Sequence, residues 1–187
     1  MLEEMLIAYC SPTLADLKTG NLFSYSPGCE ECLAEEIAIW NYFLNPRDVY
    51  LELFNRSEGK VLIYVYRKNR LLRDLLRPEA SRFLESLGYN VQELICSRKA
   101  LASVFSLLKS RLITDNGFPH EIGLFLSYPL EDVLGFIINN GRDYKLCGYW
   151  KVYGNEKQAE RIFNVYSTCR RVYLSLFYCG KSIQQLI

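Results

Sequence analysis

The sequence predicts an α+β fold: a single domain over residues 1–187, with a small mixed or antiparallel sheet of about four strands and helices packed on it. Three observations support this class. Half of the 187 residues are hydrophobic, which is enough to bury a core without disulfides or metal. Short runs that combine aromatic and aliphatic residues have the composition of strands. Longer segments between them carry apolar residues at helical spacing, and no repeat or flexible linker divides the chain.

The first part of the chain predicts a short helix over residues 2–9 and, after a passage rich in proline and glycine, a strand over residues 21–26. From Glu30 the apolar residues follow helical spacing. Glutamates fill the first two turns of this segment, where they suit the positive end of the helix dipole. Asn45 and Pro46 are predicted to end the helix.

The central part predicts a β-hairpin followed by helices. Residues 49–54 and 60–67 have strand composition, and the sequence NRSEG between them suits a hairpin loop. Residues 69–90 show helical spacing, with Gly88 placed as a C-terminal stop. Residues 97–113 predict another amphipathic helix.

Residues 118–136, FPHEIGLFLSYPLEDVLGF, predict two short helices joined by a turn. Pro119 is expected at the first position of a helix ending near Leu126, and Pro129 at or near the first position of the next, because proline suits the first turn. Beyond them, residues 144–154 predict a strand.

A long C-terminal helix is predicted over residues 155–178, with Asn155 as its cap and Gly180 after its end. Two glycines, Gly123 and Gly135, fall inside the predicted helices of residues 118–136. Each costs about 1 kcal/mol relative to alanine. Close packing is the favoured explanation, and a ligand approaching the backbone is the alternative.

Three blocks of the sequence carry a resemblance to a known family: CSPTLADLK (10–18), FPHEIGLFLSYPLEDVLGFI (118–137) and KLCGYWKVYG (145–154). Together they resemble a bacterial family catalogued as domain of unknown function 3793, and the likeness extends over most of the chain. The resemblance implies no reaction. The family pattern has a small residue after the cysteine, as in CAPTL, and a glycine in LGYPLED, where this chain has Ser11 and Ser127. Ser127 weakens any argument that this position needs a glycine backbone.

Charge and composition argue against several classes of partner. The 22 basic and 21 acidic residues leave a formal charge of +1, so nucleic acid and anionic membranes are not expected partners. No apolar run is long enough to span a bilayer, and the acidic N-terminal segment is unlike a secretory signal. The seven cysteines are odd in number, which favours reduced thiols. A cytoplasmic location is expected.

His120 is the only histidine in the chain and the first catalytic candidate. It could activate the thiol of Cys10 or Cys147, with the adjacent carboxylate of Glu121 orienting its ring. The favoured alternative is structural: His120 caps its helix or bonds a neighbouring loop. This is usual for a histidine without a second catalytic signature.

Cys29 and Cys32 have a spacing that could hold a metal or close a small disulfide. A zinc site needs two further ligands at suitable spacing, and no second such pair exists. The glutamates between the two cysteines would raise the thiol pKa. Ordinary cysteines at a helix start are therefore the favoured explanation.

Three aromatic residues, Tyr149, Trp150 and Tyr153, flank Lys151 in a segment that could line a pocket for a flat ligand, although strand aromatics more often belong to the core. With Gly123, they are the predicted ligand-binding residues.

The sequence thus favours a binding or accessory protein for a small ligand, metal or protein partner, acting through residues 118–136 and 147–153. The alternatives are an enzyme using Cys–His thiol chemistry, and redox or metal handling through Cys29 and Cys32. No particular cofactor or oligomeric state is implied.

Overall fold

The structure is a computed structural model. It describes the chain except residues 1, 29, 58, 96–99 and 114–117, together with the side chains of 30, 31 and 55–57. The chain divides into two compact units: unit 1 comprises Met1–Asn69 and Asn164–Ile187, and unit 2 comprises Arg70–Phe163. The α+β class is confirmed, whereas the single domain stays a prediction.

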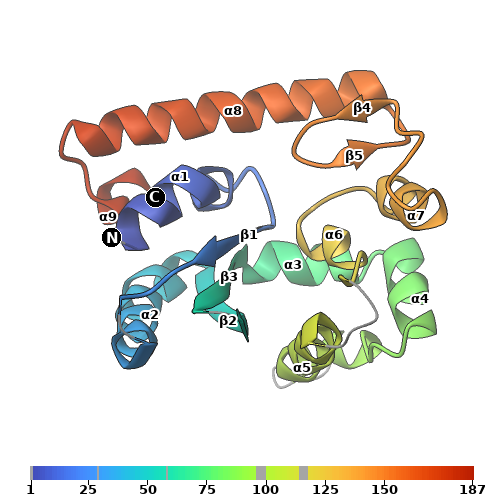
Figure 1. Ribbon diagram of the computed structural model, residues 1–187, viewed down its shortest axis with the longest axis horizontal. Coiled ribbons are helices and arrows are strands. Elements are labelled where there is room, and N and C mark those ends of the chain that lie inside the picture. Colours follow the sequence, from blue (N-terminus) through green and yellow to red (C-terminus); the bar gives the residue numbers. More distant parts are fainter. Residues whose placement is uncertain (1, 29, 58, 96–99, 114–117) are drawn as a thin grey trace. The chain divides into compact units, whose positions relative to one another are not determined.

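Unit 1 combines a sheet with helices (Figure 1). Its elements are α1 (Leu2–Leu14), β1 (Gly20–Tyr25), α2 (Glu30–Leu44), the 3-10 turn η1 (Asn45–Arg47), β2 (Val49–Ser57), β3 (Lys60–Arg67) and α9 (Ile183–Leu186). Two helices cross the division of the chain, namely α3 (Lys68–Leu75) and α8 (Glu156–Tyr178). Unit 2 contains α4 (Pro78–Ser86), η2 (Gln92–Ile95), α5 (Ala100–Ile113), α6 (Ile122–Phe125), α7 (Leu130–Ile138), β4 (Leu146–Cys147) and β5 (Lys151–Val152).

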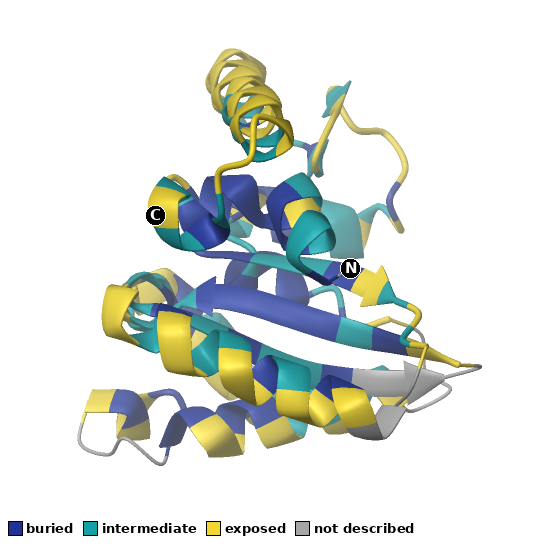
Figure 2. Cartoon of the chain, turned by 90° about the vertical axis from the view of Figure 1, so that its left-hand side faces the viewer, coloured by how far each residue is buried: buried dark blue, intermediate teal, exposed yellow. Residues whose placement is uncertain are grey.

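The sheet of unit 1 is antiparallel with the order β1-β3-β2, so β3 is its central strand. The predicted hairpin is confirmed, with a register shift between Leu53 and Asn55. Alternate residues of β3, namely Val61, Ile63 and Val65, face α1 and α2 and are buried with them in one apolar core. Figure 2 shows how much of the sheet is buried. Strand alternation therefore determines the composition of this core.

The end of α1 is held by a charged side chain. This helix is longer than predicted, reaching Leu14 rather than residue 9. The guanidinium of Arg67, at the end of β3, donates a hydrogen bond of 2.7 Å to the carbonyl of Thr13 and another to that of Leu14. Carbonyls at a helix C-terminus lack partners inside the helix, so a cation there stabilises the end.

The start predicted for the first helix of residues 118–136 is wrong. This helix begins only at Ile122 rather than Pro119, because the amides of Ile122 and Gly123 bond three residues back and form a turn before it. Pro129 lies directly before α7, with an extended ψ of 144°, so its predicted place at or near the first helical position is confirmed.

The strand predicted over residues 144–154 is also wrong, since it is replaced by the two-residue strands β4 and β5. A turn joins them, with the amide of Gly148 bonded to the carbonyl of Trp150. Alternating aromatic residues in this segment therefore do not form one continuous strand.

The ends of the long helix agree with the sequence. Asn155 accepts a hydrogen bond of 3.0 Å from the amide of Gln158, which is an N-terminal cap. Gly180, with a φ of +89°, lies just after the helix end at Tyr178. In the part of the chain that the structure describes, no helix combines the length and apolar character needed to cross a membrane.

Candidate functional site

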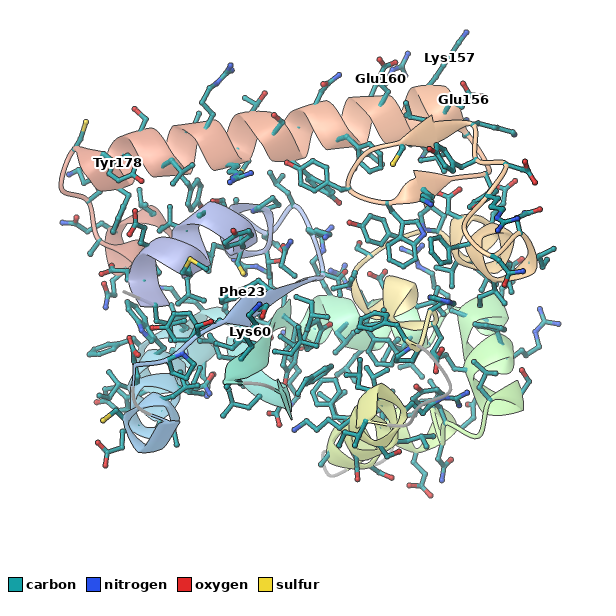
Figure 3. The ribbon with its side chains drawn as sticks, viewed as in Figure 1. Phe23, Lys60, Glu156, Lys157, Glu160 and Tyr178 are labelled. Carbon is teal, nitrogen blue, oxygen red and sulfur yellow. The ribbon has the colours of Figure 1, made fainter. Side chains whose placement is uncertain are left out.

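An aromatic cluster in unit 2 joins the two segments that the sequence predicted to act together, residues 118–136 and 147–153. The rings of Tyr128 and Trp150 stack with centroids 4.8 Å apart, and Phe136 lies 5.4 Å from Trp150. The imidazole of His120 packs on Phe136 with centroids 4.7 Å apart. The Tyr128 hydroxyl also donates to the carbonyl of Tyr149 at 3.0 Å. Figure 3 shows the side chains that fill the space between α6, α7 and β5.

The buried carboxylate of Asp132, in α7, binds the backbone of residues 153 and 154. One of its oxygens accepts hydrogen bonds from the amides of Tyr153 at 2.8 Å and Gly154 at 2.9 Å. Lys151 donates to the carbonyl of Gly141 at 2.6 Å, and the Tyr153 hydroxyl donates to that of Arg142 at 2.9 Å. The side-chain polar groups of Lys151 and Tyr153, two of the five predicted ligand-binding residues, are therefore bonded within unit 2.

The two helical glycines allow close packing. A Cβ added at Gly123 would lie 2.6 Å from the side chain of Val133 and 3.0 Å from Trp150. A Cβ at Gly135 would lie 2.3 Å from the ring of Tyr153. Distances below about 3 Å are not tolerated without movement, so both helices need glycine to approach the aromatic segment. Packing explains both positions.

Glu121 is buried in a polar cluster of its own. A single carboxylate oxygen accepts from Arg111 and from the Tyr89 hydroxyl, each at 2.9 Å. Burial, and then the adjacent carboxylate, raise the pKa of Tyr89. No bond to His120 is present among the described residues, so the Glu121 carboxylate joins α5 and Tyr89 together rather than orienting the imidazole.

The thiols proposed as partners of His120 lie in different places. Cys147 is exposed in β4, and neither its sulfur nor the imidazole forms a hydrogen bond with another described residue. Cys10 belongs to unit 1, where it is fully buried. Burial raises its thiol pKa well above the usual range, against a smaller opposite effect of Lys18. Cys10 is thus a neutral core residue.

The metal hypothesis also gains no support from the geometry. Cys29 lies outside the described residues, and Cys32 is exposed on α2. Among the residues whose placement is described, no group of three or more His, Cys, Asp or Glu side chains could hold a metal ion.

Ser127, between α6 and α7, corrects an inference from the sequence. Its φ is +73°, a left-handed conformation that glycine adopts most readily. The other described non-glycine residues with positive φ are Asp16, Asp48, Asn140 and Asp143, types that tolerate this conformation better than serine. The position does require a glycine-like backbone, contrary to the argument from the serine.

A pocket of about 450 Å³ opens beside this turn, entirely within unit 2. The starts of α4, α7 and α8 converge on it. Its lining consists of Asp74, Arg77, Glu79, Ala80, Leu124, Ser127, Tyr128, Pro129, Leu130, Glu131, Gln158 and Ile162. The residues that α3, α4 and α8 contribute are distant in sequence and carry no motif, so no sequence pattern predicts them.

Carboxylates dominate the charge of the pocket. Asp74 forms an ion pair of 2.9 Å with Arg77, whereas Glu79 and Glu131 have no ion pair with any residue that the structure describes. Both glutamates lie in the first turns of their helices, where the dipole favours them. Leu124 and Tyr128 are buried and supply an apolar wall. The pocket thus combines apolar surface with excess negative charge.

Fold and site together define an α+β protein with a ligand-sized polar pocket in one of its two units. The chain belongs to the family described as Protein of unknown function (DUF3793), which matches residues 6–187. The resemblance inferred from the three sequence blocks is confirmed. No curated protein and no solved structure matches the chain.

Proposed function

We propose that the protein is a binding protein and that unit 2 takes a small, positively charged organic ligand into the pocket beside Ser127. One observation carries this proposal: an open pocket of about 450 Å³ holds two carboxylates, Glu79 and Glu131, without ion pairs to described residues. Pockets of about 300 to 1,000 Å³ suit small molecules.

The lining specifies the kind of ligand. An amine or guanidinium group would be attracted by Glu79 and Glu131, because Arg77 is already paired with Asp74. The apolar part of the ligand would lie against Leu124 and Tyr128. An anion would meet three carboxylates and a single, partnered cation, so it is disfavoured.

The aromatic segment predicted as the ligand surface has a supporting role in this proposal. Trp150 stacks on Tyr128, one of the lining residues, and Asp132 holds the segment in place. The two distinctive sequence blocks would therefore shape the pocket wall.

We also propose a cytoplasmic location and a single folding domain. The described cysteines Cys10, Cys32, Cys147, Cys169 and Cys179 are free thiols, which supports a reducing, cytoplasmic setting. A single folding domain is supported by α3 and α8, each of which continues from one unit into the other.

Titration calorimetry with agmatine as the cationic probe and succinate as the anionic one tests the pocket. Agmatine should bind and succinate should not. Glu131→Gln should weaken agmatine binding about fivefold, as for one exposed ion pair. Glu160→Gln is the matched control, since Glu160 is on the outer side of α8 and outside the lining (Figure 3). Binding of succinate, or equal agmatine binding by both variants, would contradict the proposal.

A further inference from the structure

Gly154 lies against the carboxylate of Glu131, which lines the pocket of unit 2. A Cβ added at Gly154 would lie 2.3 Å from Oε2 of Glu131, 2.7 Å from its Cδ and 3.2 Å from its Oε1. Contacts below about 3 Å are not made by a real Cβ, so Oε2 occupies the space that a side chain would fill. The missing side chain therefore lets the carboxylate pack on the backbone of residue 154.

The backbone of Gly154 is held from two sides. Its amide donates to Oδ1 of the buried Asp132 at 2.9 Å, and its carbonyl accepts from Nζ of Lys145 at 3.0 Å. Asp132 directly follows Glu131 in α7, so the carboxylate and the backbone beneath it are fixed to the same helix. Of these two consecutive acidic residues, Asp132 binds the segment and Glu131 lies over it at the pocket.

This packing makes the two oxygens of Glu131 unequal. Oε2 is the atom nearest to the position of the added Cβ, whereas Oε1 lies farther from it. A guanidinium binds a carboxylate best as a planar fork that uses both oxygens. An ammonium group is a compact charge and can bind a single oxygen. The freer oxygen, Oε1, therefore suits an ammonium group better than a guanidinium.

We propose that Gly154 is a specificity-determining residue of the pocket and that the ligand is a primary amine, whose ammonium group binds Oε1 of Glu131. This assignment rests on the function proposed above and narrows the ligand from an organic cation to an amine. A guanidinium at the same place would bind through one oxygen only and would lose the second bond of its fork.

Gly154→Ala separates the position of the carboxylate from the stability of unit 2. Gly154 does not have a positive φ, so its backbone accepts alanine. The atom that the new Cβ would meet is the end of a flexible side chain, so the Glu131 carboxylate can move aside. The variant keeps the charge and displaces it, and the midpoint of its urea unfolding should stay close to that of the wild type.

Titration calorimetry with three dications of equal chain length tests the selectivity. Putrescine, agmatine and 1,4-diguanidinobutane share a four-carbon chain and carry two, one and no ammonium groups. The wild-type chain should bind putrescine and agmatine. It should bind 1,4-diguanidinobutane about fivefold more weakly than agmatine, the effect of one exposed ionic contact.

Gly154→Ala should bind agmatine and 1,4-diguanidinobutane equally, because the displaced carboxylate no longer has one covered oxygen. Glu131→Gln should also lose the preference, and in that background Gly154→Ala should have no further effect, since no carboxylate is left to position. Gly148→Ala is the matched control. It is the same change in the same segment, but its Cβ meets the ring of Phe163, so the preference should persist.

Three results would overturn this assignment and leave the proposed pocket intact. They are a wild-type chain that binds 1,4-diguanidinobutane as tightly as agmatine, a Gly154→Ala variant that keeps the preference, and a Glu131→Gln variant that keeps it. Circular dichroism would establish that each variant is folded, and Glu131→Gln decides the question if Gly154→Ala is not. A wild-type chain that binds none of the three probes would contradict the proposed function itself, and the assignment with it.

Discussion

The two units of this protein achieve stability in different ways. Unit 1 packs α1 and α2 on one face of a three-stranded sheet, and its core is a continuous set of aliphatic side chains. Unit 2 also buries aliphatic side chains, among them Leu75, Leu84 and Val104. It has only two-residue strands among its described residues, and it adds stacked aromatic rings, the Asp132 carboxylate and the ion pair of buried Glu121 with half-buried Arg111.

This difference predicts which unit tolerates substitutions with little loss of stability. Aliphatic cores accept exchanges that preserve volume, usually at a cost below about 1.5 kcal/mol. Contacts that depend on a missing Cβ or a buried carboxylate have no equivalent replacement. Unit 2, which carries the pocket, should therefore be the more sensitive to conservative substitutions.

The largest expected effect is at Gly135. In Gly135→Ala the new Cβ would meet the ring and the Cβ of Tyr153, so backbone must move, and we expect a loss of about 3 kcal/mol in the free energy of unfolding. Urea unfolding measures it. Gly28→Ala in unit 1 is the control, because nothing lies within 4 Å of its added Cβ. Equal effects at both glycines would remove the contrast between the units.

Glu121→Gln should lower the free energy of unfolding by about 2 kcal/mol. It removes the charge that balances the half-buried Arg111, although the amide oxygen could still accept from Tyr89. The same change at Glu131, an exposed carboxylate of the same unit, should stay within about 0.5 kcal/mol. A similar loss for the two variants would show that the buried pair has no special role.

Lys18 is the one buried charged side chain among the described residues of unit 1, and burial lowers its pKa to about 7. The unfolded chain keeps a lysine pKa of about 10.4, so above about pH 7 it binds a proton that the folded chain lacks. Stability should therefore rise with pH between about 7 and 8.5, by up to about 1.4 kcal/mol per unit.

Above this window the thiol of Cys10 acts in the opposite direction, because burial raises its pKa and the unfolded chain ionises first. Lys18→Met should remove most of the increase in the free energy of unfolding between about pH 7 and 8.5, as measured by urea unfolding at several pH values. If the variant keeps the slope of the wild type, the rise has another origin.

The smallest expected effect is an increase in the free energy of unfolding. Ser127→Gly relieves a left-handed serine in unit 2 and should raise the free energy of unfolding by about 0.5 to 1 kcal/mol. Ser127→Ala keeps the strain and should bring no gain. The midpoint of thermal unfolding distinguishes the two variants, and an equal shift would mean that backbone conformation is not responsible.

Much of the fold could be predicted from local patterns. The β2–β3 hairpin, the cap at Asn155 and the end of α8 before Gly180 all follow from the spacing of apolar residues and the conformational preferences of single residues. The errors occurred where aromatic residues alternate without forming a strand, as in residues 144–154.

The candidate site was only partly predictable. The sequence blocks that contain His120 and Trp150 do come together, as expected. The pocket itself depends on Arg77, Glu79 and Gln158, which belong to other helices and carry no recognisable pattern. Glu121 looked like a partner for the adjacent histidine, whereas its carboxylate bonds Arg111 and Tyr89.

By itself, the sequence determined the α+β class, the hairpin and the main helices, because these depend on periodicity and on residues that start or stop an element. It also identified the family through three blocks of residues. Tertiary structure alone decided that Gly123 and Gly135 serve packing, that Ser127 is left-handed and which carboxylates in the pocket have no ion pair with a described residue. These properties depend on contacts between segments far apart in the chain, which no local pattern encodes.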